Sequence, residues 1–284
     1  MEYNVDKVQA QLGAVVFSVF FIVYFFELIS GRMKRFKRPL RDAAFSLVGL
    51  IGQPIVSGAL LGGAAGYLLI QLFPAASLGL IDTPIWVAYL FLFIIKEFLH
   101  YWIHRMAHEW RWLWKLHRTH HSGLDMSVGL MYRYNIFWMF LLPQPWLGAF
   151  SMYTGIYEAY ALAVLTSYLC NVFTHTSFRW DIYLREKFPR TEPLWLALEK
   201  VITLPDAHHA HHAYGRGAHA NGNYAVTLFV FDHLFGTAKN PHQRQVNVGL
   251  PISPRLHWAE ELMWPIIKKP LLAKNTSKVN DDKI

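Results

Sequence analysis

Residues 84–108 read PIWVAYLFLFIIKEFLHYWIHRMAH, an apolar run that leads directly into two histidines four positions apart. A helix needs about 20 mostly apolar residues to cross a bilayer, and Pro84 to Trp102 is close to that length. Residues four apart on a helix share a face, so His104 and His108 would direct their imidazoles the same way. The stretch therefore predicts a membrane-spanning helix that ends in a metal-binding motif.

The composition of the whole chain agrees with a membrane protein. Apolar residues make up 54% and charged residues 16% of the 284 positions, whereas a soluble domain has roughly 25% charged residues. The net charge of +8 lies beside apolar runs, which favours an anionic membrane surface over a nucleic-acid partner. The single cysteine, Cys170, lies in an apolar run, which excludes a disulfide framework and a thiolate zinc site.

Two further apolar runs precede this one, and a hairpin follows it. Leu12 to Ile29 is the first run, and Ala43 to Phe73 is a longer second run interrupted by glycines and a proline. Ile136 to Phe150 and Ile156 to Val172 form the hairpin, whose first arm is short for a full span. No cleavage pattern follows the first run, so we expect an anchor and not a signal peptide.

The distribution of cations predicts which side of the membrane the histidines face. Six cations occupy residues 32–41, and the positive-inside rule places that loop in the cytoplasm. Counting crossings places residues 104–135 and everything after Val172 on the same side. Four more cations lie in the C-terminal region, Lys268, Lys269, Lys274 and Lys278. If the second run instead folded as a re-entrant pair, the number of crossings would change and the histidines would face the other side.

The fifteen histidines are clustered, with six in residues 100–121 and five in residues 208–219. Three helical spacings recur among them: His104 and His108; His117, His120 and His121; His208, His211 and His212. Imidazole suits Zn, Cu, Fe and Ni, and eight converging nitrogens are more than one tetrahedral ion can use. A lone histidine is more often a packing or surface residue, but three such spacings on one predicted side indicate a site for two metals.

The remaining histidines differ in their expected roles. His175 ends the last apolar run and is a candidate ninth ligand, whereas His100, one turn before His104, is expected to pack or to support a ligand. His209 points off the ligand face of its helix, and the role of His219 is open. Three others are expected to be ordinary surface or interface residues: His233, His242 and His257.

Taken in order, these motifs resemble the fatty acid hydroxylase superfamily, which includes sterol desaturases, sphingolipid hydroxylases and sterol C4-methyl oxidases. The resemblance covers about half of the chain: Glu97, residues 101–108 and 113–122, His175, and residues 203–212 and 223–237. Two positions depart from the family pattern. Asn171 stands where fatty-acid 2-hydroxylases often have a histidine, and Phe231-Asp232-His233 replaces Trp-Asp-Arg or Trp-Asp-Lys.

The resemblance implies a membrane-bound non-haem di-iron enzyme that uses O₂ and two electrons to hydroxylate or desaturate a lipid. It implies nine metal ligands: His104, His108, His117, His120, His121, His175, His208, His211 and His212. It also implies a lipid substrate from the membrane and a separate electron donor, either cytochrome b5-like or a ferredoxin or reductase, because no cytochrome b5-like domain precedes the first run. The expected location is a bacterial inner membrane or the endoplasmic reticulum, with the histidines facing the cytoplasm.

Two further sets of residues lie where they could assist such a site. Carboxylates close to the histidines could orient imidazole N–H groups, or could cap helices or lie at the surface: Glu97, Asp125, Asp206 and Asp232. Aromatic residues of the hairpin could line a groove to the metals, or could face lipid as an interface belt: Trp138, Phe140, Trp146, Phe150 and Tyr153.

We therefore expect an all-α fold, a multi-pass membrane helical bundle with a cytoplasmic helical cap that holds a histidine-rich di-metal site. Residues 1–95 would form a transmembrane region, 96–250 a catalytic region that includes the hairpin, and 251–284 a cytoplasmic tail. The favoured function is hydroxylation of a lipid C–H bond, with desaturation on the same scaffold as the alternative. A metal transporter or sensor is a further alternative, but a transporter places its ligands near mid-membrane.

Overall fold

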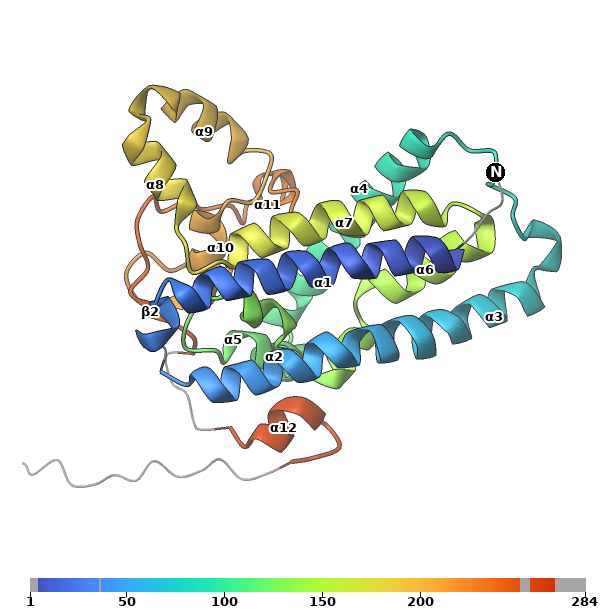
Figure 1. Ribbon diagram of the computed structural model, residues 1–284, viewed down its shortest axis with the longest axis horizontal. Helices are drawn as coiled ribbons and strands as arrows, with labels where there is room; N and C mark the ends of the chain where they lie inside the picture. Colours follow the sequence, from blue (N-terminus) through green and yellow to red (C-terminus); the bar gives the residue numbers. More distant parts are fainter. Residues whose placement is uncertain (1–4, 36, 251–255, 269–284) are drawn as a thin grey trace, which may run out of the picture.

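The computed structural model describes residues 5–35, 37–250 and 256–268, and nearly all of its regular structure is helical. Three helices are long and apolar enough to cross a membrane: α1 (Val5–Ile29), the continuous helix Pro39–Leu72, and α4 (Ile85–Glu109). The first two run lengthwise along one face of the bundle, and α4 passes behind them (Figure 1). The predicted all-α bundle with long apolar spans is confirmed.

The second of these helices is a single rod with an unusual middle. It consists of α2 (Pro39–Gln53), the π-helical segment η2 (Pro54–Gly62) and α3 (Gly63–Leu72). Pro54 has no N–H, and its ring would clash with a carbonyl of the preceding turn, so the wider π turns accommodate it without ending the helix. The second apolar run therefore forms one rod, and not the re-entrant pair that the sequence left open.

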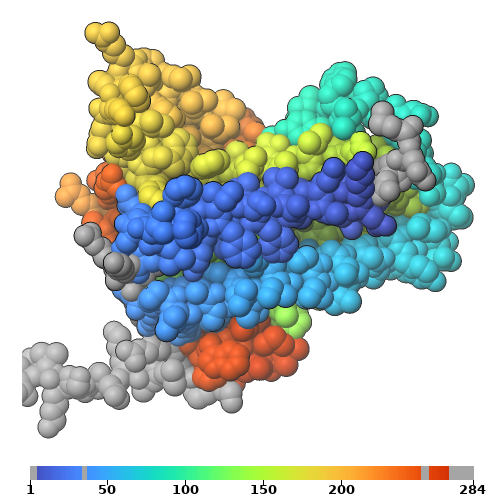
Figure 2. Space-filling model, in the orientation of Figure 1, coloured from blue at the N-terminus to red at the C-terminus, as the bar shows by residue number. Residues whose placement is uncertain are grey.

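Apolar side chains cover the outer faces of these helices. Phe25 is 59% exposed, Leu60 62% and Trp86 65%. Figure 2 shows α1 and the Pro39–Leu72 rod side by side across one face of the molecule. A soluble monomer rarely exposes a continuous apolar surface of this kind, whereas lipid tails would cover it.

The predicted hairpin lies within the bundle. Its first arm is divided into a short 3-10 segment, η5 (Ile136–Phe140), and α6 (Pro143–Thr154), and its second arm is α7 (Tyr157–His175). Gly155 ends α6 with a φ of 87°, a left-handed conformation that glycine adopts freely. Neither arm belongs to the three candidate spans, because α6 has only 12 residues and α7, which packs against α1 and α4, carries several polar residues.

The cation-rich segment 32–41 and the histidine motifs lie at the same end of the bundle. Lys37 N donates a hydrogen bond of 2.7 Å to Asp125 Oδ2, close to the second histidine motif. The α6–α7 turn lies at the other end, where Leu78 N donates to Tyr153 O. That the histidine end faces the cytoplasm remains a prediction. Three of the cations used for it lie outside the described residues: Lys269, Lys274 and Lys278.

Shorter elements cap the histidine end, where α5 (Arg111–His121) and α10 (Pro205–His212) carry six of the nine implied ligands. β1 (Ala213–Tyr214) pairs antiparallel with β2 (Asn247–Val248) beside α10. Helices α8 and α9 extend away from the bundle at this end (Figure 1). The remaining helical segments are η1 (Arg32–Arg35), η3 (Pro74–Ala76), η4 (Val128–Tyr132), α8 (Trp180–Lys187), η6 (Pro189–Thr191), α9 (Glu192–Leu198), α11 (Val230–Leu234) and α12 (Trp258–Met263).

Part of the expected C-terminal tail is folded against the bundle. Glu261 on α12 is buried and accepts hydrogen bonds from Ser122 Oγ at 2.5 Å and from Arg133 Nη2 at 3.2 Å. Arg41 also forms an ion pair with this carboxylate. Arg133, which is itself buried, also forms an ion pair with Asp42 on α2. The guanidinium of Arg133 therefore joins α12, through Glu261, to α2, through Asp42.

Replacing Glu261 with alanine should lower the free energy of unfolding by about 3 kcal/mol, because removing one partner leaves a buried guanidinium short of negative charge. Thermal unfolding of the purified protein in detergent measures this. Glu260→Ala is the matched control, since the neighbouring Glu260 pairs with Arg118 nearer the surface. Equal losses in the two variants would contradict the structural role assigned to Glu261.

Candidate metal centre

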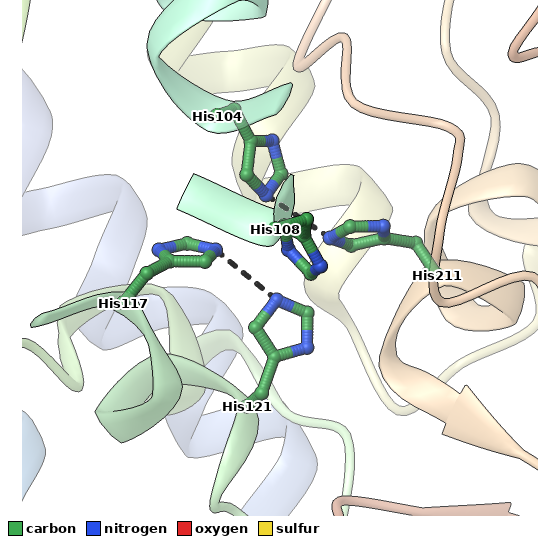
Figure 3. A group of neighbouring side chains, drawn as sticks. All are labelled: His104, His108, His117, His121 and His211. Atoms are coloured by element: carbon green, nitrogen blue, oxygen red, sulfur yellow. Dashed lines mark hydrogen bonds between the residues drawn. The ribbon is translucent and has the colours of Figure 1, made fainter. Parts of the chain in front are cut away.

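Nine imidazoles meet in two adjoining groups, and within each group the ligand nitrogens lie within 4.8 Å of one another. The first group contains His104, His108, His117, His121 and His211. Figure 3 shows these five rings converging from three separate segments of the chain. The second group contains His120, His175, His208 and His212. All the histidines that the resemblance implied as ligands are brought together in this way.

Helical geometry distributes neighbouring histidines between the two groups. Successive residues of an α-helix point about 100° apart, so His120 and His121 on α5 serve different groups. His211 and His212 on α10 do the same. The rings of His121 and His212, one from each group, are stacked with centroids 4.4 Å apart. The two groups are therefore immediate neighbours.

Backbone carbonyls fix the orientation of several of these rings. The Nδ1 atom of His104 donates to Tyr224 O at 2.6 Å, and that of His211 donates to Gly222 O at 2.7 Å. His175 makes the same contact with Asn171 O at 2.9 Å. Because a carbonyl can only accept, the proton of each neutral ring is on Nδ1. Each Nε2 atom then carries a lone pair and is free to bind a metal.

The contact between His104 and His211 shows that the first group fits a metal ion. Their Nε2 atoms lie 3.0 Å apart (Figure 3), although both rings have already given their proton to a carbonyl. Two lone pairs at this distance repel each other unless a cation lies beside both. Two imidazole nitrogens that bind one ion at about 2.1 Å in adjacent positions are separated by about 3 Å.

Unpartnered nitrogens in both groups lead to the same conclusion. His108 Nε2 in the first group and His212 Nε2 in the second are buried and have no hydrogen-bond partner in the part of the chain that the structure describes. Leaving a buried polar atom unpaired costs about 1–3 kcal/mol. The donor set consists of imidazoles alone, which suits iron, zinc, copper or nickel and does not suit calcium or magnesium.

Burial keeps the cap histidines in the state that binds metal. It lowers the pKa well below the ordinary histidine value for each of these residues on α5 and α10, with neighbouring imidazoles adding to the effect: His117, His120, His121, His208, His211 and His212. A neutral imidazole offers its lone pair to a metal, whereas a protonated one cannot. At neutral pH these imidazoles are therefore unprotonated and able to bind a metal ion.

Two cavities adjoin the histidines, and they share no lining residue. An inner cavity of about 120 Å³ within the bundle is lined by His104, His117, His120, His175 and His208. An outer cavity of about 390 Å³ beside the β1 strand is lined by His108, His121, His211 and His212. The nine histidines are thus divided between a membrane-side cavity and a cap-side cavity.

Of the hairpin aromatics, Trp138 lines the inner cavity, and its ring centroid lies 4.5 Å from that of His117. Phe140 is 40% exposed and Trp146 48%. Both proposed roles therefore occur, since Trp138 contacts the site and the other two lie at the surface. Phe150 packs with the apolar core around Ala88 and Leu92, and Tyr153 is buried at the far end of the bundle.

None of the candidate carboxylates bonds a histidine of the two groups directly. Glu97 accepts from Ser167 Oγ and Thr227 N, while Asp206 accepts from Arg179 and from the backbone of His242. Asp125 accepts from Lys37 N. The expected orienting role is taken by backbone carbonyls, which a sequence motif cannot reveal.

Asp232 supports the site through one of those carbonyls. It accepts hydrogen bonds of 2.8 Å from the backbone N–H groups of Tyr224 and Ala225. The carbonyl of Tyr224 is the acceptor for His104 Nδ1. The carboxylate therefore positions His104 through the loop and not by contact.

The other histidines lie outside both groups. The His100 ring centroid is 5.8 Å from that of His104, and His100 lines the inner cavity. His209 is buried but contributes to neither group, as expected. His219 bonds the carbonyl of Thr237. The three histidines expected at the surface lie outside the site; His242 pairs with Glu199, and His257 caps α12.

Comparison with known proteins agrees with this geometry. A family model described as "Fatty acid hydroxylase" matches residues 89–237, just over half of the chain. The chain belongs to the fatty acid hydroxylase family. No solved structure matches it significantly.

Several curated relatives share this region. The chain is 31% identical to an alkylglycerol monooxygenase of Xenopus tropicalis over 60% of this chain and 34% of that protein. It is 30% identical to an alkylglycerol monooxygenase of Homo sapiens over 62% of this chain and 37% of that protein. An ornithine lipid hydroxylase, OlsE, of Rhizobium tropici is 30% identical over 62% of this chain and 49% of that protein. The match thus spans about a third to a half of these relatives' length.

The buried neutral histidines predict that the metal-free protein loses stability in acid. The unfolded chain takes up protons as the pH falls through about 6.5, whereas the folded α5 and α10 histidines stay neutral because their pKa is lowered. The unfolding temperature of metal-free protein in detergent should therefore be lower at pH 5.5 than at pH 7.5. His212→Leu should reduce this difference, and an identical unfolding temperature at the two pH values would contradict the argument.

Asp232→Asn should lower metal affinity by about tenfold or more, because the amide cannot accept both N–H groups and the Tyr224 carbonyl would shift away from His104. Metal retention against a chelator, measured on purified protein, tests this. Glu109→Gln is the control, since Glu109 is an exposed carboxylate on the same helix as His104 and pairs only with Arg105 among the described residues. Unchanged retention in Asp232→Asn would rule out the positioning role.

Proposed function

We propose that this chain is a membrane-bound non-haem di-iron oxygenase that hydroxylates a C–H bond of a lipid. The observation that carries the proposal is the pair of adjoining all-imidazole groups. Histidines of both groups line a cavity inside an apolar bundle. Two groups support two ions, one held by five histidines and one by four. The named activities of the relatives, alkylglycerol monooxygenase and ornithine lipid hydroxylase, support a lipid as the substrate.

The proposed reaction consumes O₂, two electrons and two protons for each C–H bond converted to an alcohol, with the second oxygen atom leaving as water. Bound iron would supply the activation of O₂ and the oxidation of the C–H bond. The chain's own residues hold the ions through neutral imidazoles and place the substrate carbon beside them. Met131, Leu142 and Val164 line the inner cavity with apolar surface that excludes bulk water and accepts an alkyl chain.

The two cavities support separate routes for the lipid and for the reductant. The inner cavity lies between the apolar helices, so we assign it to the lipid. The outer cavity lies at the cap and is lined by Asn221 and several small residues as well as histidines, so we assign it to delivery of electrons by a separate donor. Trp114 lines it, with its ring centroid 5.1 Å from that of His108.

The transporter alternative has less support. Both histidine groups lie at one end of the bundle, on the last turns of α4 and α7 and on the cap helices α5 and α10. A transported ion would need ligands near mid-membrane. We place the protein in a membrane with its histidine end towards the cytoplasm, where a soluble electron donor could reach the outer cavity.

Wild-type protein should carry two iron ions per chain and add one oxygen to a lipid in cells. His211→Ala should disrupt the five-histidine group and His212→Ala the four-histidine group, and each should lower lipid oxidation at least about 100-fold because the two ions would act as a unit. The measurements are metal analysis of purified protein and lipid mass spectrometry of expressing cells. The variants remove neighbouring residues of one helix, so they test the division between groups directly.

His209→Ala is the matched control, because His209 is buried on the same helix but belongs to neither group. It should retain both ions and full lipid oxidation. Wild-type activity in His211→Ala or a single ion in the wild type would disprove the di-iron proposal. A lipid that loses two hydrogens instead of gaining oxygen would make the protein a desaturase on the same scaffold.

A further inference from the structure

The inner cavity contains polar groups that the histidine site does not use. Besides its histidine and apolar lining, it is bordered by Gln53, Lys96, Gln144, Ser167 and Asn171. All five come from helices of the bundle. Burying a polar side chain among membrane helices costs free energy, so such residues usually have a function. Lys96 is the only cation among the cavity's described lining residues.

Lys96 lies near the middle of α4, and its side chain is 3% exposed. Its ammonium group donates to Glu97 Oε1 at 2.6 Å, which is its one hydrogen-bond partner among the described residues. An ammonium group has three N–H donors. Two donors on a buried charge that borders a cavity are therefore available to a molecule inside that cavity.

The partnership with Glu97 does not by itself explain this lysine. Glu97 also accepts from Ser167 Oγ at 2.6 Å and from Thr227 N at 2.9 Å, so it joins α4 to α7 and to the loop after Ala225. A protonated glutamic acid or a glutamine at position 97 could accept comparable hydrogen bonds from Ser167 and Thr227 without a buried cation beside it. A buried ion pair is often no more stabilising than an apolar pair of the same size.

Two carboxamides add unused hydrogen-bonding capacity to the same space. The Oδ1 atom of Asn171 and the Oε1 atom of Gln144 are buried and have no hydrogen-bond partner among the described residues. Both residues line the inner cavity with Lys96. The cavity therefore offers a donor from the lysine and acceptors from the amides, which together suit a ligand group that both accepts and donates.

We infer that Lys96, with Asn171 and Gln144, binds a hydroxyl or amide group of the lipid and so positions the chain for oxidation. This inference rests on the proposed function for the oxidation step, but not for the binding. Lys96, His100 and His104 occupy successive turns of one face of α4, so Lys96 and His104 are about 12 Å apart along the helix. A polar group held at Lys96 would fix which carbon of the alkyl chain lies beside the histidines.

The test compares 1-decanol with decane, two probes that differ only in a hydroxyl group, as tritiated ligands of the full-length metal-free protein in detergent. The wild type should bind 1-decanol at least about tenfold more tightly than decane, the effect expected of a hydrogen bond to a buried charge. Equal affinity for the two probes would overturn the inference. Because this measurement needs no turnover, its result is independent of the proposed oxygenase activity.

Two variants separate recognition from packing. Glu97→Gln retains the lysine amine, whereas the double variant Lys96→Met with Glu97→Gln removes it without leaving a buried unpaired charge. Only the double variant should lose the preference for 1-decanol, and its affinity for decane should stay unchanged. Loss of the same preference in Glu97→Gln alone, or equal weakening of both probes in the double variant, would show that the pair only supports the fold.

Discussion

Backbone carbonyls impose the constraint on which the histidine centre depends, because they fix the tautomer of rings that face one another. Tyr224 O and Gly222 O both accept from an Nδ1–H group, which leaves the Nε2 lone pairs of His104 and His211 opposed at 3.0 Å. An ordinary pair of histidines would relieve such a contact by sharing a proton. Here each ring has already donated its proton, and burial disfavours a second one, so a bound cation is the remaining way to stabilise the pair.

The carbonyls are themselves held in place by the segment that follows α10. Asn223 adopts a φ of 57°, and its Nδ2 group donates to Ala207 O at 2.8 Å, which fastens the loop to the histidine helix. Asp232 then accepts from the two following backbone N–H groups. The resemblance to the family continues from Asn223 to Thr237 although this stretch supplies no histidine to either group. Its role is to position the acceptors of the ligand rings.

Helical spacing made much of the centre predictable, and tertiary packing decided the rest. Histidines three or four apart share a face, so convergence within α5 and within α10 followed from the sequence. Which histidines form one group did not, because the adjacent His120 and His121 belong to different groups once α10 packs against α7. His175 was a candidate ligand from its position at the end of the last apolar run, and the family resemblance added to that prediction. The carbonyl acceptors could not be predicted, because every residue has a backbone carbonyl whatever its side chain.

The same limits apply to the fold. Apolar runs of about 20 residues identified the three spans, since length and hydropathy are local properties. The hairpin's first arm was harder, because Pro143 and Pro145 start a new helix after the 3-10 segment and divide what looked like one run. α12 was expected to be part of a tail, since six residues that include two acids give no signal of burial. Its position depends on Arg133, which is distant in sequence and buried beside Glu261.

The histidines of α10 are divided between the two cavities as well as between the two groups. His211 and His212 both face the outer cavity, whereas His208, one turn earlier on α10, faces the inner one. A small rotation of this short helix would therefore alter ligands on both sides together. A lipid that packs against the α10 side of the inner cavity would therefore displace the α10 residues that line the outer cavity, because close-packed interiors transmit displacement. Entry of substrate and delivery of electrons would then be linked by one eight-residue helix.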